Sequence, residues 1–258
     1  MWEYAVVCAV ALLASALTFF SGFGLGTLLL PAFAAFFPPG LAVAMTAVVH
    51  LANSLFKLGL VGRFASRPVV WRFGLPAIVA SFAGAALLVR LTDLAPLAEW
   101  SLGERAMIVT PLKLVVAGLM AAFALVEGLP HIERYSLGPR YLPLGGVLSG
   151  FFGGLSGHQG ALRSAFLLRC GLDARGFVGT GVAIACLVDI TRLVVYADRL
   201  DALRGARAAG PMLAATLAAF VGALAGRSLL PKVSMRWIQT TVAILLVVLS
   251  LALGSGLL

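Results

Sequence analysis

The stretch that decides the fold runs from Ser21 to Lys57 and reads SGFGLGTLLLPAFAAFFPPGLAVAMTAVVHLANSLFK. It is mostly apolar, and glycines and then prolines interrupt it at Gly22, Gly24, Gly26, Pro31, Pro38 and Pro39. Glycine and proline break helices, so we expect one helix to end near the glycines and a new one to begin after the prolines.

The helix expected after the prolines carries four polar residues, Thr46, His50, Asn53 and Lys57. Their spacings of 4, 3 and 4 place all four on one helical face. A polar face inside an apolar helix, next to a glycine-broken helix, is typical of a binding site built within a membrane.

The composition is that of a membrane protein, with 61% hydrophobic residues, 11% charged residues and a mean hydropathy of +1.05. Apolar runs of spanning length recur, which predicts an all-α polytopic membrane protein embedded in a lipid bilayer. The net charge of +9 is scattered over short loops, so we expect no nucleic-acid partner. Three separated cysteines and no phosphate-binding loop predict no metal site, no cofactor and no ATP hydrolysis.

The first apolar segment, residues 4–37, is too long for one membrane-spanning helix and too short for two. A helical hairpin, or a helix broken at Gly22–Gly26, fits it better. A break leaves backbone N–H groups that need partners in lipid. A bound anion is one such partner, and close glycine-mediated helix packing is the alternative.

The same plan occurs twice. The first half, residues 1–130, has further spans expected at about 41–62, 72–91 and 107–127. After a connecting loop at 131–140, the second half, residues 141–258, has a glycine-broken segment at 141–168, a helix at about 174–197 and spans at about 206–229 and 235–254. We therefore predict two transmembrane repeats and about eight spans.

The orientation of the repeats follows from the Lys and Arg residues in the loops. If each broken segment returns to its own side as a hairpin, the two sides of the membrane receive nine and five basic loop residues. If each broken segment crosses the membrane once, the two sides receive eight and six basic loop residues. The stronger bias favours inverted repeats, with both termini outside and the 63–72 loop in the cytoplasm.

The duplicated pattern resembles the TauE/SafE sulfite-exporter family of transporters. The residues that carry the resemblance are Gly22-Phe-Gly-Leu-Gly-Thr-Leu-Leu-Leu-Pro31, Thr46 to Asn53, Gly153-Gly-Leu-Ser-Gly-His-Gln-Gly160 and Gly179-Thr180-Gly181. The second half departs from the family pattern, because Arg163 and Ser164 stand where a proline would follow the glycines. The resemblance covers nearly the whole chain and implies transport of sulfite, sulfoacetate or a related organosulfonate across the cytoplasmic (inner) membrane of a bacterium.

Charged residues inside the spans need a reason, because a central charge costs roughly 2.5–3.5 kcal/mol on insertion scales. Arg163 lies within a glycine-broken segment, which predicts anion binding, with a structural pair to Asp189 or to a carbonyl as the alternative. Arg192 follows Asp189 by three residues on the same face, which favours an intrahelical ion pair. His50 and His158 are expected either to carry protons or to be neutral and hydrogen-bonded.

We therefore expect a secondary transporter that exports a small sulfur-containing anion by alternating access, with proton coupling as an option; the alternative is an anion channel or facilitator. No motif supports an enzyme built on His158, Cys186 and Asp189, so no enzymatic activity is expected. Substrate identity and oligomeric state stay open. The expected substrate-binding residues are Ser21, Gly22, Gly24, Gly26, Thr46, His50, Asn53, His158, Gln159, Gly160, Arg163, Thr180, Asp189 and Arg192.

Overall fold

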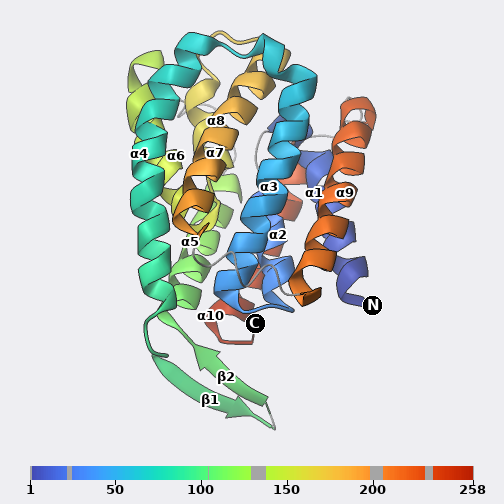
Figure 1. Ribbon diagram of the computed structural model, residues 1–258, viewed down its shortest axis with the longest axis vertical. Helices are drawn as coiled ribbons and strands as arrows, with labels where there is room; N and C mark the ends of the chain where they lie inside the picture. Colours follow the sequence, from blue (N-terminus) through green and yellow to red (C-terminus); the bar gives the residue numbers. More distant parts are fainter. Residues whose placement is uncertain are drawn as a thin grey trace.

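A computed structural model of the chain describes residues 2–21, 25–103, 105–128, 138–197, 206–229 and 235–257. These residues are mostly helical (Figure 1). The first half contains α1 (Trp2–Ser21), α2 (Leu25–Ala34), α3 (Pro39–Val61), the short helix η1 (Gly62–Phe64), α4 (Arg67–Thr92), β1 (Ala98–Leu102), β2 (Arg105–Val109) and α5 (Pro111–Gly128). The second half contains the short helix η3 (Pro139–Tyr141), α6 (Leu142–Ser156), α7 (Gly160–Leu167), α8 (Ala174–Val195), α9 (Ala206–Leu229) and α10 (Met235–Gly254).

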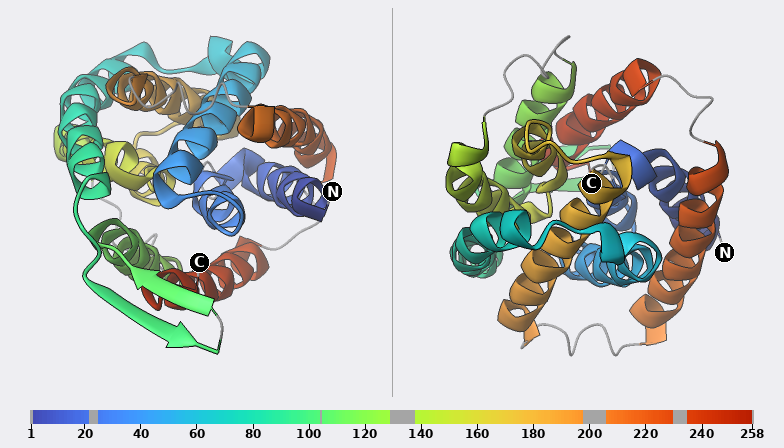
Figure 2. Two further views of the ribbon diagram at one scale, coloured as in Figure 1. Left: turned by 60° about the horizontal axis from the view of Figure 1, so that its bottom comes forward. Right: turned by 90° about the horizontal axis from the view of Figure 1, so that it is seen from above.

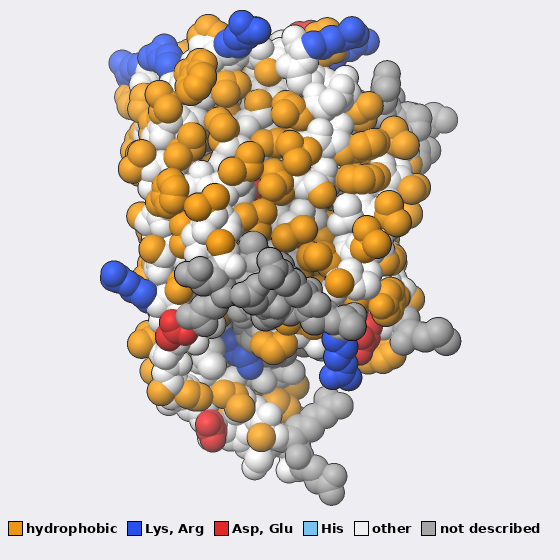
Figure 3. Space-filling view, in the orientation of Figure 1, with side chains coloured by type: hydrophobic (Ala, Val, Ile, Leu, Met, Phe, Trp, Pro, Cys, Tyr) orange, Lys and Arg blue, Asp and Glu red, His pale blue; other side chains and the backbone are white. Residues whose placement is uncertain are grey.

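The surface of the helical body is apolar, as a membrane requires. Hydrophobic side chains cover the face seen in Figure 3, and Val79, Leu125 and Leu251 are each about 70% exposed. In the described part of the chain, four segments are long and apolar enough to cross a membrane: Gly40–Phe64, Arg67–Thr92, Ala174–Val195 and Arg207–Gly226. The chain is thus a multi-pass helical membrane protein, as expected, whereas the count of eight spans stays a prediction.

The helices pack in pairs drawn from opposite halves of the chain. α1 packs along α9 and α6 along α4, while α3 packs against α8 and α5 against α10. Figure 2 shows these pairs surrounding the short helices α2 and α7. All ten residues of α2 are buried, which fits its place inside the bundle.

Both glycine-broken segments fold back on themselves. The ring of Trp2, at the start of α1, lies 4.8 Å from the ring of Phe36, just after α2. In the second half, a Cβ added to Gly145, near the start of α6, would lie 2.5 Å from the ring of Phe166, near the end of α7. Each segment therefore begins and ends on the same side of the bundle, as a helical hairpin does.

Glycines allow two of the helix pairs to approach closely. Three glycines of α6, spaced four apart, each lie so near α4 that an added Cβ would be 2.2 Å from a backbone carbonyl oxygen. The pairs are Gly146 with Phe73, Gly150 with Ala77 and Gly154 with Ser81. In the other pair the glycines belong to α9, where Gly222 and Gly226 face the backbone of α1. Small residues at such interfaces increase the packing contact between membrane helices.

The region between α4 and α5 corrects two expectations. The sequence predicted a loop to 106, a helix from 107 and an entirely helical fold, but β1 and β2 form an antiparallel hairpin that pairs Ala98 with Val109. Met107 and Val109 are buried, whereas Ala106 and Ile108 are exposed, which is the two-residue period of a strand. Gly103, with φ of +63°, allows the tight turn, and Pro111 begins the helix instead.

Candidate functional site

The break between α6 and α7 depends on one glycine. Gly157 ends α6 in the left-handed conformation, with φ of +84° and ψ of 0°. A Cβ at this position would also lie 2.7 Å from Nη1 of Arg192. Conformation and close approach both require glycine here. The break is held open by Ser149, whose hydroxyl donates a hydrogen bond of 2.9 Å to the backbone oxygen of Gln159.

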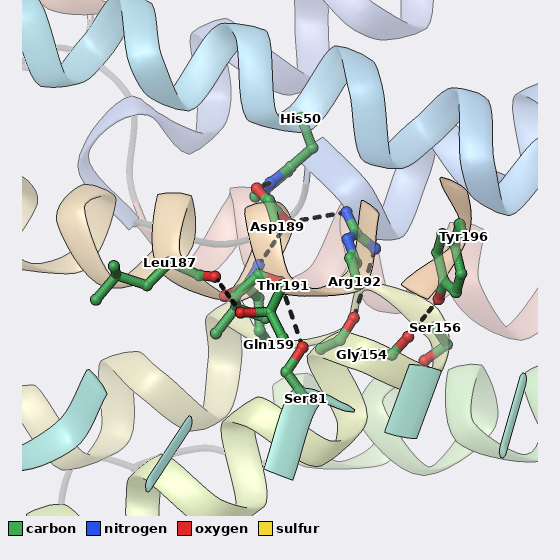
Figure 4. Close-up of polar contacts among 12 residues, drawn as sticks. His50, Ser81, Gly154, Ser156, Gln159, Leu187, Asp189, Thr191, Arg192 and Tyr196 are labelled. Atoms are coloured by element: carbon green, nitrogen blue, oxygen red, sulfur yellow. Dashed lines mark hydrogen bonds and ion pairs between the residues drawn. The ribbon is translucent and has the colours of Figure 1, made fainter. Parts of the chain in front are cut away.

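Asp189, on α8, is the centre of the polar cluster (Figure 4). One carboxylate oxygen, Oδ2, lies 2.5 Å from Nδ1 of His50 on α3. The other, Oδ1, accepts a hydrogen bond of 3.0 Å from Nε2 of Gln159 in the α6–α7 break. Nη2 of Arg192 lies 3.0 Å from the same Oδ1. The expected intrahelical pair between Asp189 and Arg192 is therefore present, and His50 joins the first half of the chain to the second.

Arg163 reaches this cluster through Gln159. Its Nη1 donates a hydrogen bond of 3.0 Å to Oε1 of Gln159, the amide that contacts Asp189. Arg163 is thus connected to Asp189 through the amide of Gln159. The guanidinium also lies close to α8, since a Cβ added to Gly181 would be 3.4 Å from its Nε.

The tips of the two hairpins meet at this cluster. Gly26, in the first turn of α2, faces the α6–α7 break: an added Cβ would lie 3.3 Å from the carbonyl oxygen of Gly157. The same Cβ would lie 3.4 Å from the ring of His50. Nearby, Asn53 on α3 accepts a hydrogen bond of 3.1 Å from the hydroxyl of Ser15 on α1. Both halves of the chain therefore contribute to one buried polar region.

His158 lies on the side of this region that faces α5. Its ring stacks on Phe123, with centroids 5.3 Å apart and planes at 8°. Its Nδ1 lies 2.9 Å from the hydroxyl of Ser156. The side chain is 2% exposed, so an aromatic ring and a hydroxyl hold it in place inside the protein.

The charges of the cluster do not balance. Lys57, Arg163 and Arg192 are each at most 5% exposed, and Asp189 is fully buried. Among the buried side chains that the structure describes, Asp189 is the one carboxylate. Arginine stays charged at any working pH, so the two guanidinium groups alone exceed the single negative charge, and a protonated Lys57 adds to the excess.

The structure brings together most of the expected site residues. Gathered at the hairpin tips are Gly26, His50, Asn53, His158, Gln159, Gly160, Arg163, Asp189 and Arg192, and Thr46 lies one turn before His50 on α3. Thr180 is engaged elsewhere, because its hydroxyl accepts a hydrogen bond of 2.9 Å from the backbone N–H of Ser66. Gly22, Gly24 and the side chain of Ser21 lie outside the described residues.

Sequence reasoning missed several supporting residues. Ser15 and Ser149 anchor Asn53 and the α6–α7 break, and Tyr196 donates a hydrogen bond to the carbonyl oxygen of Gly154. Ser81 donates a hydrogen bond of 3.3 Å to the backbone oxygen of Val188. Small hydroxyl residues within apolar helices look like packing residues, so the sequence offered no separate signal for them.

Two helical hairpins that meet at buried charged groups inside a multi-pass helical protein form the architecture of a membrane transporter. The chain belongs to the TauE/SafE sulfite exporter family, whose model matches residues 7–253. This family is one of transporters of small sulfur-containing anions, and membership agrees with the resemblance seen in the glycine-rich motifs. No curated protein and no solved structure matches the chain.

Proposed function

We propose that the protein is a secondary transporter that exports sulfite, sulfoacetate or a related organosulfonate across a bacterial inner membrane. The observation that carries this proposal is the excess of buried positive charge where the hairpin tips meet. Burying a net charge inside a protein is costly. A small anion at this place offsets the excess of Lys57, Arg163 and Arg192 over Asp189.

Alternating access between two inverted repeats is the mechanism we propose, and the packing of the helices supports it. In chain order, α1 to α5 of the first half correspond to α6 to α10 of the second half. If each helix is exchanged for its counterpart, the pair α1–α9 becomes α6–α4, and the pairs α3–α8 and α5–α10 stay the same. A two-fold relation between the halves has this property. Rocking one repeat against the other would expose the central site to each side in turn.

The pair of His50 and Asp189 is our candidate for proton coupling. It joins the two halves of the chain at 2.5 Å, and both groups can gain or lose a proton. It also belongs to the cluster where we place the anion. A proton bound to this pair would therefore change the charge balance at the transport site.

Counterflow in proteoliposomes tests the proposed function. We expect vesicles preloaded with unlabelled sulfoacetate to accumulate labelled sulfoacetate transiently, because a transporter exchanges substrate through one alternately exposed site. Empty liposomes are the control. An anion channel would instead give conductance in planar bilayers without counterflow. Absence of counterflow for sulfite, sulfoacetate and taurine alike would contradict the proposal.

The orientation of the protein gives a second test. Arginines gather at the end of the bundle where η1, η3 and the start of α8 lie (Figure 3): Arg63, Arg67, Arg72, Arg140, Arg169 and Arg175. Arg175 lies over the ring of Phe64 at 5.3 Å, which places the α7–α8 connection beside η1. Since basic loops face the cytoplasm, we expect alkaline phosphatase fused after Leu258 to be active and green fluorescent protein there to stay dark. Fluorescence from the fusion would place the C-terminus in the cytoplasm and contradict the expected orientation.

A further inference from the structure

Four buried polar atoms at the hairpin tips make no hydrogen bond with any described residue. They are Oγ1 of Thr46, Nε2 of His158, and Nε and Nη2 of Arg192. All three side chains are at most 2% exposed. The great majority of buried polar atoms in proteins have a hydrogen-bond partner. Nη2 has Oδ1 of Asp189 at 3.0 Å as an ion-pair partner, so it is the other three atoms that point to a ligand.

The residues that carry these atoms lie toward the same side of the contact between His50 and Asp189. His158 follows Gly157, where an added Cβ would lie 2.7 Å from Nη1 of Arg192. α3 and α8 run in opposite directions, since η1 at the end of α3 packs against the start of α8. Thr46 lies one turn before His50 on α3, and Arg192 lies nearly one turn after Asp189 on α8. Because the two helices are antiparallel, both residues lie on the same side of the contact between His50 and Asp189.

The guanidinium of Arg192 presents a specific kind of site. Its Nη1 lies 3.5 Å from the carbonyl oxygen of Gly153, whereas Nε and Nη2 form the other edge of the planar group. Two parallel N–H groups on such an edge match two oxygens of one anion. Asp189 lies 3.0 Å from Nη2 without forming a hydrogen bond to it, and its oxygens already contact His50 and Gln159.

We propose that this edge of Arg192 binds the transported oxyanion directly, with Nε2 of His158 and the hydroxyl of Thr46 as further contacts. Arg163, which donates to Gln159, is then a positioning residue for the amide beside Asp189. The site favours anions with at least two oxygens, such as sulfite and sulfonates, over chloride, whose single acceptor atom cannot form two parallel hydrogen bonds. This inference rests on the proposed function and names the residues that perform it.

Equilibrium binding of sulfite and sulfoacetate to the purified full-length protein tests the inference. Arg192→Lys keeps the charge but loses the two-donor edge, so we expect affinity to fall roughly 10- to 100-fold. Arg163→Lys should weaken binding less. Thr46→Val removes a hydroxyl that makes no hydrogen bond with the described residues. It should lower affinity about 3- to 10-fold, the loss of one neutral hydrogen bond, without lowering the melting temperature measured in the absence of anion.

Thr191→Val is the matched control, because Thr191 is the residue next to Arg192 and its hydroxyl donates 2.8 Å to the backbone oxygen of Leu187. We expect it to bind the anions normally. Unchanged affinity in both Arg192→Lys and Thr46→Val, or a larger loss in Arg163→Lys than in Arg192→Lys, would overturn the inference and leave the proposed function standing. A wild-type protein that binds none of the anions would overturn the proposed function itself. Thr46→Val also decides the matter if Arg192→Lys fails to fold.

Discussion

Replacing Asp189 with alanine is expected to destabilise the fold by about 3–5 kcal/mol, the usual effect of breaking a buried ion pair. The carboxylate is fully buried and contacts His50, Gln159 and Arg192. Without it, the guanidinium of Arg192 remains inside the protein with no negative charge beside it. Since proteins are stable by only about 5–15 kcal/mol, much of the folded protein should be lost. Thermal melting of the detergent-solubilised variant, followed by size-exclusion chromatography, measures this.

A double variant separates charge from packing in this prediction. Asp189→Leu combined with Arg192→Met removes both charges and keeps apolar volume, so it should recover part of the stability that Asp189→Ala loses. It should still fail to transport, because the proposed oxyanion contact is gone. If Asp189→Ala alone melted at the wild-type temperature, the carboxylate would not be the counterion that holds the two halves together.

Gly150→Leu is the second change expected to have a large effect. A Cβ at this position would lie 2.2 Å from the carbonyl oxygen of Ala77 and 2.6 Å from its Cα. Both contacts are with backbone, which cannot rotate away, so α6 would have to move off α4 along the whole glycine-lined contact. Overpacking typically costs about 1–3 kcal/mol and sometimes more. Separating these helices also disturbs Gly153 and Gly157 beside Arg192, so we expect loss of both folded yield and anion binding.

Gly118→Leu is the control for the change at Gly150. Gly118 is an exposed glycine within α5, and a Cβ there would meet nothing within 4 Å. Leucine favours a helix more than glycine does and is at home against lipid. We therefore expect normal yield and normal melting. Equal yields from Gly150→Leu and Gly118→Leu in the same expression host would refute the close contact of α4 with α6.

The helices could be predicted well from the sequence, because apolar length and helix-breaking residues act locally. The spans expected at 206–229 and 235–254 coincide with α9 and α10, and the helix expected at 174–197 is α8 with two residues fewer. The hairpin of β1 and β2 was missed, because Ala106 to Val109 are all apolar and their alternating exposure appears only in the structure. An apolar run that short fits a strand and a helix start equally well.

The sequence indicated which polar residues share a helical face, but not which of them are in contact. The spacing of the four polar residues of α3 placed them on one helical face, and Thr46, Asn53 and Lys57 are buried in the structure. The contact of His50 with Asp189 joins residues 139 positions apart, and only the packing of α3 on α8 brings them together. Spacing along one helix reveals local pairs such as Asp189 with Arg192, whereas it carries no information on which side chains meet across helices.

The pairing of α1 with α9 has a consequence for how the protein is made. About 185 residues separate Ser21, the end of α1, from Ala206, the start of α9. At a synthesis rate of about 5–20 residues per second, α1 resides in the membrane for roughly 10–40 s before its partner leaves the ribosome. Its sequence suits this wait, since after Glu3 it carries no charged side chain and can face lipid on all sides. The glycines that allow the two helices to approach closely belong to α9, which is synthesised later. α1 therefore has to remain stable in the membrane by itself until α9 is inserted and packs against it.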